Sequence, residues 1–216
     1  MGARWMAAAM CCAAVAGLAA ANFWESKPYT EWSPKEVEAI LGDSPWTKKV
    51  SIVVQRPPRP SDDGGGRGGG DGLARGFPIP DPQLKMTLTW RSARPVREAL
   101  SRLNNGDLLI DGKPLAEQPE HYLFTLSGVP ANLRRSVPDA AKTSFLKREG
   151  KTPIPLLQGG IQPGTAATLT LIFAFPRTDP IVGGDKEVEF VTTIGTLEIK
   201  QKFKLKDLTV GGELAL

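Results

Sequence analysis

The chain of 216 residues contains only two cysteines and one histidine, and these shortages exclude several kinds of site. Both cysteines, Cys11 and Cys12, lie in the first 21 residues. The rest of the chain therefore has no disulfide, no thiol nucleophile and no Cys-ligated metal. A single histidine excludes a multi-histidine metal site, and the place of His121 beside Glu120, at a loop-to-strand boundary, favours a surface side chain. The G-x-S-x-G motif of α/β-hydrolases is also absent.

The sequence has little excess charge of either sign. Its formal net charge is +4, and the part after residue 21, which excludes Arg4, carries +3. Nucleic-acid-binding domains usually gather many more basic side chains on one face, so we expect no nucleic-acid partner. An apolar content of 41% is sufficient for a core, and the length allows one ordinary domain.

The first 21 residues, MGARWMAAAMCCAAVAGLAAA, have the pattern of a secretory signal peptide. One arginine precedes an apolar run of about 15 residues, too short for a comfortable membrane span, which ends in small residues. We expect cleavage near Ala21, export to the periplasm or the exterior, and membrane contact only before cleavage. An uncleaved anchor is the alternative. Lipidation at Cys11 or Cys12 is disfavoured because Ala9 and Met10 make a poor lipobox.

Residues 22–48 are predicted to form an N-terminal arm with a short helix. Ser33-Pro34-Lys35-Glu36 has the pattern of a capping box with proline at the first helical position. Trp32 can pack on Val37 as a hydrophobic staple, and Gly42 is expected to end the helix just beyond its last turn. Because the helix is barely two turns long, docking on the main domain must stabilise it.

The arm gathers aromatic side chains, namely Phe23, Trp24, Tyr29, Trp32 and Trp46. One interpretation is an arm that docks on a partner or stacks on sugar rings, with Trp24, Tyr29, Trp32 and Trp46 as candidate binding residues. The favoured interpretation is an arm that covers its own domain, since a staple and buried tryptophans explain most of the pattern.

Residues 49–216 are predicted to form a mainly β domain, an antiparallel sandwich-like sheet with two short helices in the whole chain. A loop at 55–82, half glycine or proline, is expected to be disordered. The second helix is predicted from Ser92 to Asn104, with Val96, Leu100 and Leu103 inward, and 130–141 as an irregular connection. The expected strands are 49–54, 84–90, 108–110, 122–129, 142–148, 154–157, 167–175, the pair within 186–206, and 213–216.

The pair within 186–206 has the clearest pattern, a hairpin with a turn at Gly195-Thr196. Glycine at the first turn position suits a type II′ turn. The register sets Val188 against Phe203 inside, and Glu189 against Lys202 and Glu187 against Lys204 outside. Lysines at 200, 202, 204 and 206 then form a stripe, of which Lys200 and Lys206 have no opposing glutamate and are candidate partner-binding residues. A solvated face with weak cross-strand ion pairs is favoured over a binding ridge.

Two stretches, YTEWSPKEVEAILGDSPW (29–46) and DKEVEFVTTIGTLEIKQKFKLKDL (185–208), resemble a family of exported bacterial proteins. That family has a YTEW…SPW opening and a lysine-rich C-terminal hairpin, and no activity is known for it. The resemblance covers about a quarter of the chain, and it implies no catalytic residue, cofactor or metal.

Two further patterns suggest chemistry. Ser144 and Lys147 have the S-x-x-K spacing of a serine nucleophile and its base, but strand alternation would place them on opposite faces. Carboxylates at 179, 185, 187 and 189 could act on a glycoside or bind Ca²⁺, but turn chemistry and lysine partners explain them.

We therefore expect a non-enzymatic interaction module without a cofactor, whose partner is an envelope protein or a glycan. The alternative is a sandwich that binds a carbohydrate or an amphiphile on Trp24, Trp32 or Trp90. A Ser/Lys hydrolase is the remote alternative.

Overall fold

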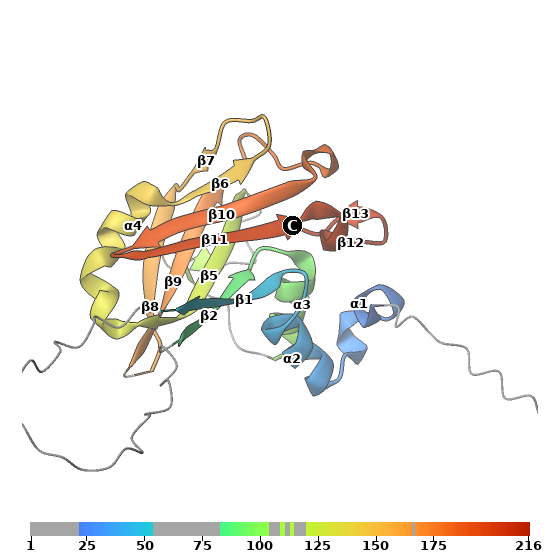
Figure 1. Ribbon diagram of the computed structural model, residues 1–216. Helices are drawn as coiled ribbons and strands as arrows, with labels where there is room; N and C mark the ends of the chain where they lie inside the picture. The colour runs from blue at the N-terminus through green and yellow to red at the C-terminus, as the bar shows by residue number, and fades with distance from the viewer. Residues whose placement is uncertain (1–21, 54–82, 104–108, 111–112, 115–119, 166) are drawn as a thin grey trace, which may run out of the picture.

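The computed structural model describes residues 22–53, 83–103, 109–110, 113–114, 120–165 and 167–216. The predicted signal peptide and the predicted loop at 55–82 lie outside the described residues. Two antiparallel sheets pack face to face (Figure 1). The five-stranded sheet has the order β1 (Thr47–Val53), β2 (Gln83–Trp90), β5 (His121–Pro130), β9 (Thr168–Pro176), β8 (Gln158–Pro163). The four-stranded sheet has the order β11 (Leu197–Lys204), β10 (Glu187–Ile194), β6 (Phe145–Arg148), β7 (Ile154–Pro155).

Short elements lie around this sandwich. Two small ladders pair β3 (Leu109–Ile110) with β4 (Lys113–Pro114) and β12 (Thr209–Val210) with β13 (Glu213–Leu214). The helices are α1 (Phe23–Ser26), η1 (Tyr29–Glu31), α2 (Pro34–Gly42), α3 (Arg94–Arg102), η3 (Ala131–Ser136), α4 (Val137–Thr143), η4 (Gly183–Asp185) and η5 (Leu205–Leu208). In Figure 1, α4 lies at one end of the sheets, and α3 and the β12–β13 ladder lie toward the other. Within the described ranges, no helix has the length and apolarity needed to cross a bilayer.

An aromatic cluster from both sheets forms the centre of the core. Trp90, Phe124, Phe190 and Phe203 are all fully buried. The Phe124 ring lies 5.3 Å from that of Phe190 and 5.7 Å from that of Phe203, which joins the two sheets. Burying each such side chain favours folding by about 1.5–3 kcal/mol. The predicted mainly β, antiparallel sandwich is therefore confirmed.

The hairpin of β10 and β11 has the predicted register. Val188 pairs with Phe203, Glu189 with Lys202 and Glu187 with Lys204, and the strands meet at Ile194 and Leu197. Gly195 has a φ of 61°, while Thr196 is not among the residues of positive φ. A type I′ turn would need positive φ at both positions, so the turn is of type II′.

Some boundaries differ from the sequence expectations. The second helix begins at Arg94 rather than after a Ser92 cap, because the Ser92 hydroxyl instead bonds the Trp90 indole and the Leu123 amide. Residues 137–143 form α4, where an irregular connection running into a strand was expected, and β8 was not predicted as a strand. The chain therefore has four α-helices in its described part, not two. Gly42 is the last residue of α2 and is not a left-handed cap.

Candidate functional site

The aromatic arm packs on its own domain. Trp32 and Trp46 are 1% and 0% exposed and belong to the main core, as does Val37. Trp24 is half-buried and packs edge to face on Trp46, with ring centroids 5.5 Å apart, and Tyr29 is 37% exposed. Neither Trp32 nor Trp46 presents a surface to a ligand, which corrects their place among the candidate binding residues. Trp90, the other candidate for stacking, is also fully buried.

The capping box of α2 is formed as predicted. The Ser33 hydroxyl accepts from the Glu36 amide at 3.4 Å, and the Glu36 carboxylate accepts from the Ser33 amide at 2.7 Å. Lys27 Nζ lies 2.7 Å from the same carboxylate. The Lys27 hydrogen bond first, then those from Ser33, lower the pKa of Glu36 to about 2. The start of the arm is therefore tied to α2.

The residues of the predicted Ser/Lys pair are separated. Ser144 is buried, and its hydroxyl bonds the Ala140 carbonyl at 2.6 Å and the Thr192 hydroxyl at 2.7 Å. Lys147 is exposed and pairs in register with Glu189, on the face of β6 opposite to the buried Leu146 and Arg148. His121, expected at the surface, is half-buried, and its Nδ1 has no hydrogen-bond partner in the described chain.

Arg148, at the end of β6, is a buried cation that the sequence analysis did not single out. Its side chain is 0% exposed. The guanidinium donates to the Asp179 carboxylate and, at 3.4–3.5 Å, to the carbonyls of Asp179, Pro180 and Thr152, and it lies 3.8 Å from the Asp185 carboxylate. A buried guanidinium is costly unless it is paired, and here carboxylates and carbonyls provide the partners of its two Nη groups, whereas its Nε has no hydrogen-bond partner among the described residues.

Asp185 completes this network from the other side. Its carboxylate lies 2.6 Å from Lys151 Nζ and accepts from the Val182 amide at 2.9 Å. Burial opposes its ionisation, but the Lys151 and Val182 hydrogen bonds and the nearby cations outweigh this, so the pKa of Asp185 lies below its ordinary value. The hydrogen bond from Arg148 likewise lowers the pKa of Asp179. The network ties the turn after β6 to the segment before β10.

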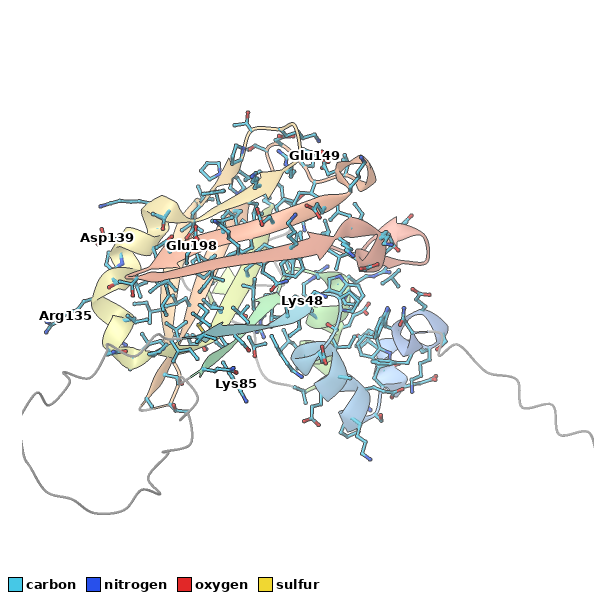
Figure 2. All side chains as sticks on the ribbon, viewed as in Figure 1. Lys48, Lys85, Arg135, Asp139, Glu149 and Glu198 are labelled. Atoms are coloured by element: carbon cyan, nitrogen blue, oxygen red, sulfur yellow. The ribbon has the colours of Figure 1, made fainter. Side chains whose placement is uncertain are left out.

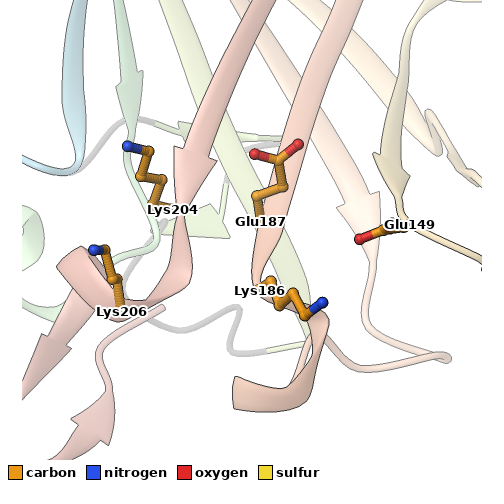
Figure 3. A pocket seen from close by; sticks show the side chains of 5 residues that line it. All are labelled: Glu149, Lys186, Glu187, Lys204 and Lys206. Atoms are coloured by element: carbon orange, nitrogen blue, oxygen red, sulfur yellow. The ribbon is translucent and has the colours of Figure 1, made fainter.

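A pocket of about 460 Å³ lies beside this network, at the end of the four-stranded sheet. Its lining residues follow β6, begin β10 and end β11, namely Glu149, Lys186, Glu187, Lys204 and Lys206. In Figure 3, the Lys204 and Lys206 side chains extend to one side and that of Lys186 to the other. The volume lies within the range of about 300–1,000 Å³ that is typical of ligand pockets.

The backbone of Lys186 has an unusual conformation. Its φ of 57° and ψ of −57° lie close to the γ-turn with positive φ, which is rare and strained. Neighbouring contacts impose this conformation, because Asp185 is held in the buried network and the Lys186 carbonyl accepts from the Leu205 amide at 2.8 Å. Strain of about 1–3 kcal/mol is typical of such residues, which cluster at functional sites.

The charges in the pocket are only partly compensated. Glu187 pairs with Lys202 Nζ at 2.6 Å, diagonally across the hairpin rather than along the register. Lys200 pairs with Glu198 at 2.7 Å, which corrects the expectation that it is unpaired. No carboxylate of the described residues forms an ion pair with Lys186, Lys204 or Lys206. Of the predicted lysines, Lys206 therefore lies at the pocket and Lys200 does not.

The arrangement can bind anions but offers no metal site within the ranges described. No group of three or more His, Cys, Asp or Glu side chains there could hold a metal ion. The lysine stripe was predicted from the sequence, but Lys186 was not, because only its backbone geometry and its place beside Asp185 distinguish it.

The protein is an antiparallel β-sandwich with a pocket lined by three lysines and two glutamates at one end of the four-stranded sheet. Comparison with protein-family models, with curated proteins and with solved structures finds no match to this chain.

Proposed function

We propose that this chain is an exported interaction module that binds an acidic protein partner through the pocket of Lys186, Lys204 and Lys206. The observation that carries the proposal is a set of three lysines that line one pocket, beside the buried network of Arg148, and that have no ion-pair partner among the described residues. The strained backbone of Lys186 supports it, since such strain often marks a binding site.

The mixed charge of the surface favours a protein over a polyanionic glycan. Glu149 and Glu187 also line the pocket, and Glu189 and Glu198 lie on the neighbouring outer face of the hairpin. These carboxylates would repel a uniformly charged polyanion, whereas a protein surface can present charges of both signs in register. The separation of Ser144 from Lys147 supports a binding role over a hydrolytic one.

A binding experiment with matched variants tests this proposal. The probe is a fluorescent peptide rich in aspartate and glutamate with interspersed lysines, and a sulfated glycan is the competing probe. The triple variant Lys186→Ser, Lys204→Ser, Lys206→Ser should bind the peptide roughly tenfold more weakly, because each exposed charge pair contributes about 0.2–1 kcal/mol. Binding by the wild-type chain should weaken as salt is raised.

The control removes the same charge elsewhere. Lys35, Lys85 and Lys142 are exposed and lie outside the pocket, so their triple serine variant should bind as the wild type does. Equal losses in both variants, or no peptide binding by the wild type, would exclude the pocket as a specific site. If the wild type bound the sulfated glycan more tightly than the peptide, and the pocket variant lost that binding, the partner would be a glycan and not an acidic protein.

A further inference from the structure

The five-stranded sheet ends at β8, whose outer edge has no neighbouring strand in the described part of the chain. β8 pairs with β9 on one side only and stands last in the sheet (Figure 1). In an edge strand, alternate N–H and C=O groups point away from the sheet. Gly159, Gly160, Ile161 and Gln162 form no backbone hydrogen bond to any described segment other than β9. This edge is therefore open to a further strand.

The β8 edge lacks the charges that protect the other edges of the sandwich. Edge strands usually carry charged side chains, which discourage pairing with another chain. β1 and β11, at the other ends of the two sheets, follow this rule, as Lys48 and Glu198 show in Figure 2. The remaining edge, β7, has only two residues and ends in a proline, which limits pairing. β8, in contrast, lies in a stretch from 152 to 176 that contains no charged residue.

Apolar side chains are exposed at the same edge. Leu157, directly before β8, is 58% exposed, and Ile161 within it is 37% exposed. Ile161 pairs with the buried Leu171, so it lies on the inner face of the sheet, at the open side of the sandwich. A strand added beside β8 would remove part of this apolar surface from water, which favours association.

Two adjacent glycines in β8 have no explanation within a single copy of the chain. Neither Gly159 nor Gly160 has a left-handed φ. A Cβ atom would lie no closer than 3.6 Å to any neighbour at Gly159 and 3.8 Å at Gly160, so packing inside the sheet does not require glycine. Glycine inside a strand often marks a place where another backbone approaches closely.

The sequence of β8 is complementary to itself. In an antiparallel pair of two β8 strands with Gly160 opposite its own copy at the twofold axis, Gly159 stands opposite Ile161, and Gln158 opposite Gln162. Gly159 and Ile161 share the inner face, so the isoleucine of each copy would occupy the space that the glycine of the other leaves empty. The glutamines share the outer face, where side-chain amides can hydrogen-bond to each other across the strands.

We propose that two copies of this chain associate through β8, in antiparallel register about Gly160, so that their five-stranded sheets join into one continuous sheet. A second copy suits this edge because both strands are neutral, and no like charges are brought opposite each other. By the same reasoning the lysine-bearing β11 edge is unsuited to pairing with itself. No residue of β8 lines the lysine pocket, so the dimer does not depend on the proposed partner site.

Sedimentation of the wild-type chain tests the association without any substitution. The wild type should form a dimer that dissociates on dilution, and Ile161→Lys should raise its dissociation constant about tenfold or more, because the new charge enters the paired edge. Leu103→Lys is the matched control. Leu103 is 41% exposed and lies outside β8, so its substitution should leave the dissociation constant unchanged. The triple lysine variant of the pocket should also remain a dimer.

Cysteine cross-linking tests the register. The chain after residue 21 has no cysteine, so a full-length background with Cys11→Ser and Cys12→Ser carries only the thiol that is introduced. Gly160→Cys should form an intermolecular disulfide on mild oxidation, because opposed Cα atoms in an antiparallel pair lie about 4.5–5.5 Å apart, which a disulfide can bridge. Lys200→Cys, on the charged β11 edge, should remain uncross-linked.

Three results would overturn the proposal. They are a wild-type chain that stays monomeric up to millimolar concentration, a dimer that Ile161→Lys does not weaken, and cross-linking at Lys200→Cys as fast as at Gly160→Cys. A monomeric wild type that captures an extended neutral peptide, and loses it on Ile161→Lys, would show that the edge pairs with another protein and not with a second copy.

Discussion

Arg148 and the pocket lysines lie next to one another and differ in almost every physical respect. The Arg148 side chain is fully enclosed, and two carboxylates and three carbonyls surround it. Lys186, Lys204 and Lys206 are exposed and have no ion pair with the described residues. Burial requires a cation to be paired, whereas water stabilises an exposed one, so only the exposed lysines remain available to another molecule.

Arg97 and Arg177 are intermediate between these two cases. They are half-buried, and their Nε atoms have no hydrogen-bond partner in the described part of the chain, as is also true of the half-buried Arg91. Burial and pairing therefore have to be considered together: a buried, paired cation has a structural role, whereas an exposed, unpaired one is available to bind another molecule. Three predictions test how far this distinction holds.

The largest effect is expected from Arg148→Met. The substitution removes the principal partner of Asp179 and one of the cations facing the buried Asp185. Removing one member of a buried ion pair costs about 3–5 kcal/mol, so the free energy of unfolding should fall by about 3 kcal/mol or more. Urea denaturation measures this, with Lys204→Met as the exposed control, expected within about 0.5 kcal/mol of wild type. Equal effects of the two substitutions would show that burial does not separate these cations.

A smaller and opposite effect is expected at Lys186. Glycine adopts positive φ without strain, so Lys186→Gly should raise the free energy of unfolding by about 1 kcal/mol, after the added freedom of the unfolded chain is counted. Lys186→Ala retains the strained backbone and should remain within about 0.5 kcal/mol of wild type. Both should weaken binding of the acidic peptide equally. If the glycine variant were less stable than the alanine variant, the backbone of Lys186 would not be strained.

The smallest expected effect is on the loss of stability at acidic pH. The pKa values of Asp179 and Asp185 lie below the ordinary value of 3.8, so their contribution to stability is present above that pH and is lost as the pH falls below it. The melting temperature of the wild type should therefore fall on acidification below about pH 3.8. The melting temperature of Asp179→Asn should fall less steeply with decreasing pH, since one titrating group is removed. The triple lysine variant of the pocket should show the same dependence of melting temperature on pH as the wild type. If the melting temperature depended on pH identically in the wild type and both variants, the pairing of Asp179 with Arg148 would not contribute to stability.

Local patterns were sufficient for a large part of the fold. The capping box at Ser33 and Glu36 depends on residues three apart, and the register of β10 with β11 depends on alternation around a two-residue turn. Both were predicted correctly because a single short segment contains all the partners. The helix at 137–143 was missed, since its short sequence has only one fully buried residue, Ala140, and so gives a weak helical periodicity.

The candidate sites were less accessible to such reasoning. The sequence offered Trp32, Trp46 and Lys200 as binding residues, but tertiary packing buries the first two, and Glu198 pairs with the third. Conversely, Lys186 carried no local signal. Its significance comes from a contact with Leu205, which is distant in the sequence.

Alternation, turn chemistry and capping act between near neighbours, so the sandwich class, the hairpin register and the docking of the N-terminal arm could be predicted from the sequence. The pairing of the cations, in contrast, depends on the three-dimensional fold. Arg148 meets Asp179 and Asp185 through segments that the fold brings to one end of the four-stranded sheet. Charge pairing depends on distance and burial in space, and no spacing along the chain encodes either one directly.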